Sequence, residues 1–120
     1  MRKLSTVLTL ALFCTSAAFG PLSAGASEMR VQNFNMSSGL SSGYVLSVTE
    51  DTKGYIWIAT MQGLDRFDGN GFINFNKDNS GLSANELNSV STVPHNPDQL
   101  WIATQRAGLC IMDISSGEIS

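Results

Sequence analysis

The sequence predicts an all-β fold built from repeated four-stranded units, and three observations carry this prediction. The tetrapeptide Trp-Ile-Ala-Thr occurs at residues 57–60 and again, unchanged, at residues 101–104. The spacing is 44 residues between the two tryptophans and 45 between Gly63 and Gly108, each of which precedes a leucine; this is the length of one β-propeller blade. Short runs rich in β-forming residues alternate with Gly-rich turns, without helical periodicity. We therefore predict a β-propeller fragment of about two four-stranded blades after a signal peptide.

The first 26 residues are typical of a secretory signal peptide. Arg2 and Lys3 form a basic start, residues 4–19 are uncharged and largely apolar, and Ala-Gly-Ala at residues 24–26 favours cleavage before Ser27. An uncleaved membrane anchor is the alternative, but hydroxyl side chains interrupt a run that would need about 20 mostly apolar residues. Cys14 follows Leu-Phe rather than the small residue that lipoprotein processing requires. We expect removal of residues 1–26 and a periplasmic product.

The composition of the exported part excludes several classes of function. Cleavage removes Arg2 and Lys3, so five of the seven basic residues remain against ten acidic ones. This negative charge repels phosphate backbones and excludes nucleic acid as a partner. Cys110 is the only cysteine left, so no disulfide forms within the mature chain, and its strand-like surroundings predict a half-buried small hydrophobic side chain. His95, the only histidine, lies in a turn-rich stretch and is interpreted as a solvated loop residue rather than a metal ligand.

The first blade and its connector are predicted over residues 44–85. Asp51 and Gly54 begin and end its first turn, because an Asp side chain bonds nearby backbone and Gly accepts a positive φ. Asp-Gly-Asn-Gly at residues 68–71 offers oxygen ligands for calcium, but no distal bidentate Glu completes the set, so we interpret it as a turn. The expected strands cover residues 44–50, 55–60, 64–68 and 72–76.

The second blade is predicted over residues 86–120 and is truncated. Residues 94–99, which include two prolines, replace the short turn of the first blade, and we expect a longer loop there. The expected strands cover residues 86–93, 100–105 and 109–114, and residues 118–120 begin a fourth.

Residues 27–43 are predicted to hold a closing strand and the lead-in to the first blade. Residues 29–35 alternate apolar and polar side chains, and their Asn-Phe-Asn ending recurs at residues 74–76. Ser-Gly-Leu-Ser at residues 38–41 likewise recurs at residues 80–83. The run at 29–35 therefore has the place of an outermost blade strand. We expect it to complete a final blade whose inner strands come from the far end of a longer protein.

The repeat resembles a known family. Residues 50–60 read Glu-Asp-Thr-Lys-Gly-Tyr-Ile-Trp-Ile-Ala-Thr and residues 63–68 read Gly-Leu-Asp-Arg-Phe-Asp, a pattern similar to the two-component regulator propeller repeat. The second copy departs from it, because residues 93–99 replace the Glu-Asp-x-x-Gly turn. The resemblance implies the periplasmic sensor of a membrane-anchored bacterial histidine kinase, often a hybrid kinase that detects carbohydrates. Some relatives end instead in diguanylate cyclases or other output domains.

Three hypotheses for function follow. The first is a ligand-sensing propeller region with an oligosaccharide ligand and a kinase outside this chain. The second is a secreted propeller enzyme that acts on glycans with two of the carboxylates of Asp51, Asp65 and Asp68, which would need to lie about 5–9.5 Å apart. The third is an inactive truncated product.

The repeated residues themselves are interpreted as structural. The two tryptophans supply apolar area for packing between blades, the turn glycines allow tight turns, and Thr60 and Thr104 end strands with a hydroxyl that bonds nearby backbone. We therefore assign no catalytic, cofactor-binding or metal-ligating residue. The ligand-contacting residues remain unknown, because two blades do not reveal which loops converge.

A chain with so few blades is expected to need partners. Closed propellers have about 4–8 blades, and fewer than about three repeats give too small a core for stable stacking. The remaining blades of a full-length protein are the first expected partner. The mature chain by itself is expected to be poorly soluble or oligomeric, with several copies completing a ring as its folded form.

Overall fold

The computed structural model describes residues 28–120. The chain divides into two units, Met1–Gln32 and Asn33–Ser120, and the strands found among the described residues belong to the second unit. Within the described residues the ordered elements are seven strands and one short 3-10 helix, η1 (Met36–Ser38). The all-β prediction is confirmed.

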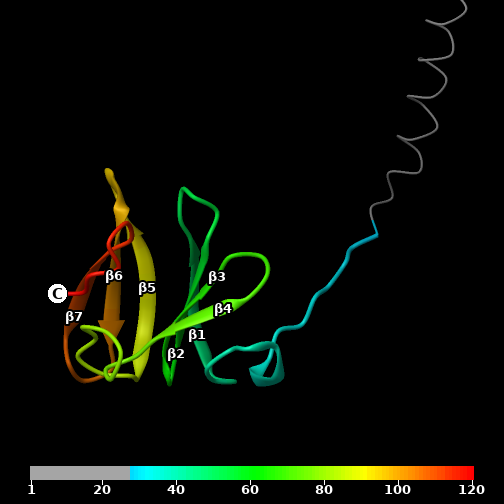
Figure 1. Ribbon diagram of the computed structural model, residues 1–120, viewed down its shortest axis with the longest axis horizontal. Helices are drawn as coiled ribbons and strands as arrows, with labels where there is room; N and C mark the ends of the chain where they lie inside the picture. Colours follow the sequence, from blue (N-terminus) through cyan, green and yellow to red (C-terminus); the bar gives the residue numbers. More distant parts are fainter. Residues whose placement is uncertain (1–27) are drawn as a thin grey trace, which may run out of the picture. The chain divides into compact units, whose positions relative to one another are not determined.

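The first sheet has four antiparallel strands that follow one another in space as they do in sequence (Figure 1). Its strands are β1 (Val45–Glu50), β2 (Ile56–Thr60), β3 (Gly63–Phe67) and β4 (Phe72–Phe75). β1, β2 and β4 are rich in β-branched and aromatic residues, whereas β3 (Gly-Leu-Asp-Arg-Phe) is held by its pairing with β2 and β4 on either side. Neighbouring strands in sequence are neighbours in the sheet, which is the meander of a propeller blade.

The second sheet has three antiparallel strands in the order β5-β6-β7. Their bounds are β5 (Leu87–Val93), β6 (Asn96–Thr104) and β7 (Leu109–Asp113). Ile119 forms an isolated antiparallel bridge with Met112. Ser120 and Ile111 exchange two backbone hydrogen bonds of 2.8 and 2.9 Å. The end of the chain therefore lies along β7 where a fourth strand would pair.

The prediction of a long loop over residues 94–99 is wrong, because β6 begins at Asn96. Only Pro94 and His95 form the turn, and His95 makes it possible by adopting a left-handed φ of 64°. The extra residues 97–99 interrupt the pairing with β5. They stay extended because β7 and its end bond them: the N–H of Ile114 donates to the carbonyl oxygen of Asp98 at 2.8 Å.

The predicted strand over residues 29–35 is also absent, since residues 28–35 form no strand in the structure. A strand needs a partner whose backbone groups complete its hydrogen bonds, and within the described residues no sheet edge pairs with this run. Asn35 instead caps η1, its side-chain oxygen accepting from the N–H groups of Ser37 and Ser38 at 2.9 and 3.3 Å.

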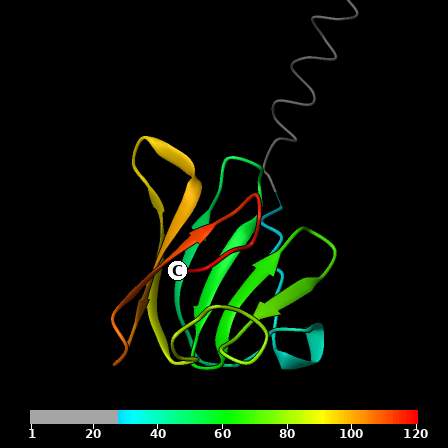
Figure 2. The same ribbon diagram turned by 60° about the vertical axis from the view of Figure 1, so that its left-hand side comes forward.

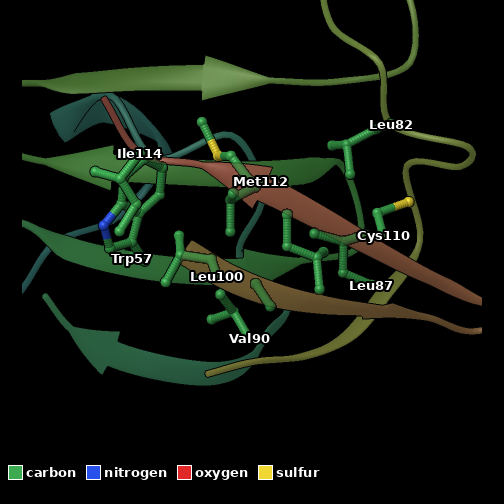
Figure 3. Packing of buried hydrophobic residues seen from close by; sticks show 11 residues of the cluster. Trp57, Leu82, Leu87, Val90, Leu100, Cys110, Met112 and Ile114 are labelled. Carbon is green, nitrogen blue, oxygen red and sulfur yellow. The ribbon is translucent and has the colours of Figure 1, made fainter. Parts of the chain in front are cut away.

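The hydrophobic core lies between the two sheets. Figure 3 shows side chains from the two sheets gathered there, among them Trp57 from β2 and Leu100 from β6. Figure 2 shows the connector at residues 76–86 running along one end of the sheets, and its Leu82 joins this core. Cys110 is 3% exposed and packs there as a small hydrophobic residue. The buried members are Trp57, Ala59, Leu64, Leu82, Leu87, Val90, Leu100, Ile102, Cys110, Met112 and Ile114.

Candidate functional site

The carboxylate of Asp51 fixes the turn between β1 and β2 and holds the repeat tryptophan in place. Its Oδ1 accepts from the backbone N–H groups of Lys53 and Tyr55 at 2.9 and 3.0 Å. Its Oδ2 accepts from the Nε1–H of Trp57 at 2.8 Å. Asp51 is 5% exposed and Trp57 is fully buried. Buried carboxylates are tolerated when hydrogen bonds satisfy their oxygens, so this Asp has a structural role.

The two repeat threonines close equivalent turns. The hydroxyl of Thr60 donates to the carbonyl oxygen of Gly63 at 2.8 Å, and that of Thr104 donates to the carbonyl oxygen of Gly108 at 2.8 Å. Both hydroxyls also accept a backbone N–H from within the turn. Their expected role as strand-ending groups that bond nearby backbone agrees with these contacts.

The carboxylates of Asp65 and Asp68 also form hydrogen bonds that hold the fold together. Asp65 is fully buried, and its Oδ2 accepts from the backbone N–H and the hydroxyl of Ser41, each at 2.8 Å. Its Oδ1 accepts from the Nδ2–H of Asn74 at 2.9 Å. Asp68 caps the β3–β4 turn, where the N–H groups of Gly71 and Asn70 bond its carboxylate and lower its pKa from the ordinary value of 3.8.

These contacts weaken the enzyme hypothesis, because a glycosidase needs two carboxylates that face a substrate. Asp51, Asp65 and Asp68 all bond the surrounding backbone or side chains instead.

Within residues 28–120, no group of three or more His, Cys, Asp and Glu side chains is placed to hold a metal ion. In the same part of the chain, no helix has the length and apolar character needed to cross a membrane.

The side chains best placed for a ligand lie at one end of the two sheets. Tyr44 precedes β1, Met61 and Gln62 form the β2–β3 turn, and the second blade has its equivalents at the same end. The carbonyl oxygen of Tyr44 accepts from the N–H of Met61 at 3.2 Å, and that of Glu86 accepts from the N–H of Gln105 at 2.9 Å. We call this the loop-end surface, and it comprises Tyr44, Met61, Gln62, Glu86, Gln105 and Arg106.

Two cavities open at the loop-end surface and share Met61. One, of about 460 Å³, is lined by Met61, Glu86, Gln105 and Arg106. The other, of about 570 Å³, is lined mostly by residues before and within β1, including Tyr44, and by Met61 and Gln62. The Nε2–H of Gln105 donates to the sulfur of Met61 at 3.1 Å, which joins the two blades at this place. Concave surfaces with apolar walls and a few polar groups are the usual form of small-ligand sites.

Sequence reasoning did not identify these residues, although the repeat contained the signal. The Trp-Ile-Ala-Thr tetrapeptide is identical in both blades, whereas the next two residues change from Met61-Gln62 to Gln105-Arg106. Loop positions whose residue type the fold does not require can be occupied by residues that bind a ligand. The sequence could not show that these positions in the two blades meet around adjoining cavities.

Comparisons with known proteins agree with the geometry. Residues 39–62 match the model of the family described as two component regulator propeller. The chain is similar to a crystal structure of "the extracellular domain of the putative hybrid two component system BT3049 from B. thetaiotaomicron", with 42% sequence identity and a TM-score of 0.67. This similarity covers 74% of the present chain, which spans 13% of the length of that structure. A search of curated proteins found no relative. The resemblance inferred from residues 50–68 is confirmed.

Proposed function

We propose that this chain, which carries a two-component regulator propeller repeat, forms part of the extracytoplasmic sensing region of a bacterial two-component system. The observation that carries the proposal is the 42% identity to an extracellular domain of such a system over 74% of the chain, with a TM-score of 0.67. The buried repeat residues support it as well, because their hydrogen bonds build blades and leave loops at the sheet ends for ligands.

The ligand proposed for the loop-end surface is an oligosaccharide. Tyr44 is 76% exposed there and offers an aromatic face with a polar hydroxyl. The side chains of Glu86, Gln105 and Arg106 line the adjoining cavity and supply hydrogen-bond donors and acceptors. A sugar presents apolar faces of C–H groups and a rim of hydroxyls, and this combination of an aromatic ring with polar groups complements both.

The signalling step is proposed to lie outside these residues. In a full-length protein, further blades would complete the propeller, a membrane anchor would follow, and a histidine kinase or another output domain would respond to the ligand. Residues 1–26 would direct the sensor to the periplasm. The chain itself would then be no enzyme.

Binding of neutral oligosaccharides to the exported chain tests this proposal. The probes are partial hydrolysates of starch, xylan and arabinan, and titration calorimetry is the readout. We expect one hydrolysate to bind, and Tyr44→Ala or Arg106→Ala to weaken that binding at least about tenfold, since each removes a principal contact. Ile73→Ala is the matched control, because Ile73 is 47% exposed and lies on β4, outside the loop-end surface.

The proposed ligand class would be wrong if none of the three hydrolysates bound. Binding that survives both Tyr44→Ala and Arg106→Ala would contradict the proposed location instead.

A further inference from the structure

The turn between β3 and β4 contains a chemically labile dipeptide. The turn reads Asp-Gly-Asn-Gly over residues 68–71, and all of these residues are exposed. Asn70 is the only asparagine in the sequence that a glycine follows. Asparagine is a labile residue, and a following glycine makes it more reactive, because no Cβ hinders the approach of the glycine nitrogen to the asparagine side chain.

The reaction available at Asn70 is deamidation through a cyclic imide. The backbone nitrogen of Gly71 loses its proton and attacks Cγ of Asn70, and the side-chain nitrogen leaves as ammonia. Water then opens the resulting succinimide at one of its two carbonyl carbons. One opening gives aspartate. The other gives isoaspartate, in which the main chain runs through Cβ and is longer by a methylene group.

The structure holds the nitrogen that would have to attack. The Oδ1 of Asp68 accepts from the N–H of Gly71 at 2.9 Å and from that of Asn70 at 2.8 Å. The N–H of Asp68 donates to the carbonyl oxygen of Gly71 at 3.3 Å and closes the turn. These bonds keep the Gly71 nitrogen from turning toward Cγ. The carboxylate also opposes loss of the proton, because a negative charge so close to the nitrogen disfavours a second one there.

We propose that Asp68 is a protecting residue, whose carboxylate suppresses succinimide formation at Asn70 through its charge and its hydrogen bonds. The N–H groups of Gly71 and Asn70 lower the pKa of Asp68, so the carboxylate is ionised at neutral pH and the protection is present there. The inference does not depend on the proposed ligand, because the turn and its bonds all lie within the first blade.

Isoaspartate at position 70 would open this turn. The added methylene lengthens the main chain between Asp68 and Gly71, whose backbone hydrogen bond closes the turn. Phe67 lies opposite Phe72 directly beside it, at the end of the pairing between β3 and β4. We therefore expect the protecting carboxylate to preserve the attachment of β4 to the first sheet as the protein ages.

The second blade supplies a matched control. Asp113 has the repeat position of Asp68, and its Oδ1 accepts from the N–H groups of Ser115 and Ser116 at 2.9 and 3.0 Å. Its turn, residues 113–117, contains no asparagine. Asp113→Ala therefore removes the same kind of cap without touching Asn70.

A second control blocks the reaction itself. Gly71→Ala should slow the attack on Asn70, because the added methyl group hinders the nitrogen. The substitution fits the fold, since a Cβ at Gly71 would meet no atom of the described residues within 4 Å.

Peptide mass spectrometry of the aged chain tests the proposal. The chain is incubated at neutral pH, and conversion of each asparagine amide to an acid is followed, with fragmentation to distinguish isoaspartate from aspartate. The same chain unfolded in guanidinium chloride gives the unprotected rate. Asn70 in the folded wild type should react at least about fivefold more slowly than in the unfolded chain, and Asp68→Ala should remove most of this difference. Asp113→Ala should leave the Asn70 rate unchanged, and adding Gly71→Ala to Asp68→Ala should suppress the reaction again.

Two outcomes would overturn the proposal directly. One is an Asn70 rate that Asp68→Ala leaves unchanged in the folded chain. The other is a folded wild type that deamidates at Asn70 as fast as the unfolded chain.

Asn79 and Asn88, each followed by serine, report whether a variant has unfolded, because their rates would then rise as well. If Asp68→Ala unfolds the chain, Asp68→Ser decides. A serine hydroxyl still accepts from the N–H groups of a turn but carries no charge, so the Asn70 rate should still rise. Equal rates for Asp68→Ser and the wild type would refute the protecting role of the charge.

Discussion

Replacing the two repeat tryptophans one at a time compares the same side chain in two environments. Trp57 and Trp101 occupy identical tetrapeptides, yet the first is fully buried and the second is 43% exposed. We expect Trp57→Phe to destabilise the fold. Trp101→Phe should instead leave the stability of this chain almost unchanged. The phenylalanine keeps an aromatic ring in each site, so the comparison does not depend on a large cavity.

The magnitude for Trp57→Phe follows from two losses. The Nε1–H hydrogen bond to the Asp51 carboxylate, at 2.8 Å, disappears; a hydrogen bond to such a group contributes about 1.5–3 kcal/mol. The smaller ring also leaves a cavity between the sheets, which costs about 1–2 kcal/mol. Together the free energy of unfolding should fall by about 2.5–5 kcal/mol. At its exposed position, Trp101→Phe should change the free energy of unfolding by about 0.5 kcal/mol or less.

Urea unfolding, followed by far-UV circular dichroism, measures both effects. The midpoint for Trp57→Phe should fall by about 1–3 M urea. The midpoint for Trp101→Phe should stay within about 0.5 M urea of the wild type. Equal losses for the two variants would refute the reasoning.

Three shorter predictions concern the turns and the leader. Gly63→Ala should cost about 2–5 kcal/mol, because Gly63 has φ +113° and a Cβ there would lie 2.3 Å from a backbone oxygen. In Gly108→Ala the added Cβ would meet no neighbouring atom, so only the strain of its positive φ remains, and the free energy of unfolding should fall by about 1–2 kcal/mol. Equal urea midpoints for the two variants would contradict this. The pKa of Asp68 is lower in the folded chain than its ordinary value of 3.8. Its carboxylate therefore contributes its full stabilisation above about pH 3.8 and loses it as the pH falls through the lower pKa of the folded state. Unfolding between about pH 5 and 2 should therefore be less pH-dependent in Asp68→Asn, and an unchanged pH profile would count against this role. Mass spectrometry of the exported protein should find Ser27 at the N-terminus, and a cytosolic product that retains Met1 would disprove export.

Much of the fold was predictable because local chemistry and repetition act over short distances. The Trp-Ile-Ala-Thr copies marked the same strand in both blades, and β2 and β6 contain them. Asp51 and Gly54 marked a turn that the structure forms with the expected Asp hydrogen bonds and a φ of 86° at Gly54. The turn at Pro94 was misjudged, because the hydrogen bonds that keep residues 97–99 extended come from β7, outside their local sequence.

The candidate site was less predictable than the fold. The repeat showed that Met61 and Gln105, which follow the identical tetrapeptides, differ between the two blades. This difference alone did not show which surface the two positions share. The contact of 3.1 Å between the Gln105 amide and the Met61 sulfur exists only because the two blades stack in register. Likewise, the sequence offered Asp65 as a catalytic carboxylate, and only the structure showed that Ser41 and Asn74 occupy its oxygens.

By itself, the sequence determined the strand-and-turn order, the blade length and the family resemblance, because these depend on residues within a few positions of one another. The tertiary structure decided which copy of each repeated side chain is covered. Trp57 and Trp101 stand in identical tetrapeptides, yet the first is fully buried and the second is 43% exposed. The physical reason is that burial depends on what lies against a sheet face, and residues 28–120 supply a covering sheet for only one of the two tryptophans.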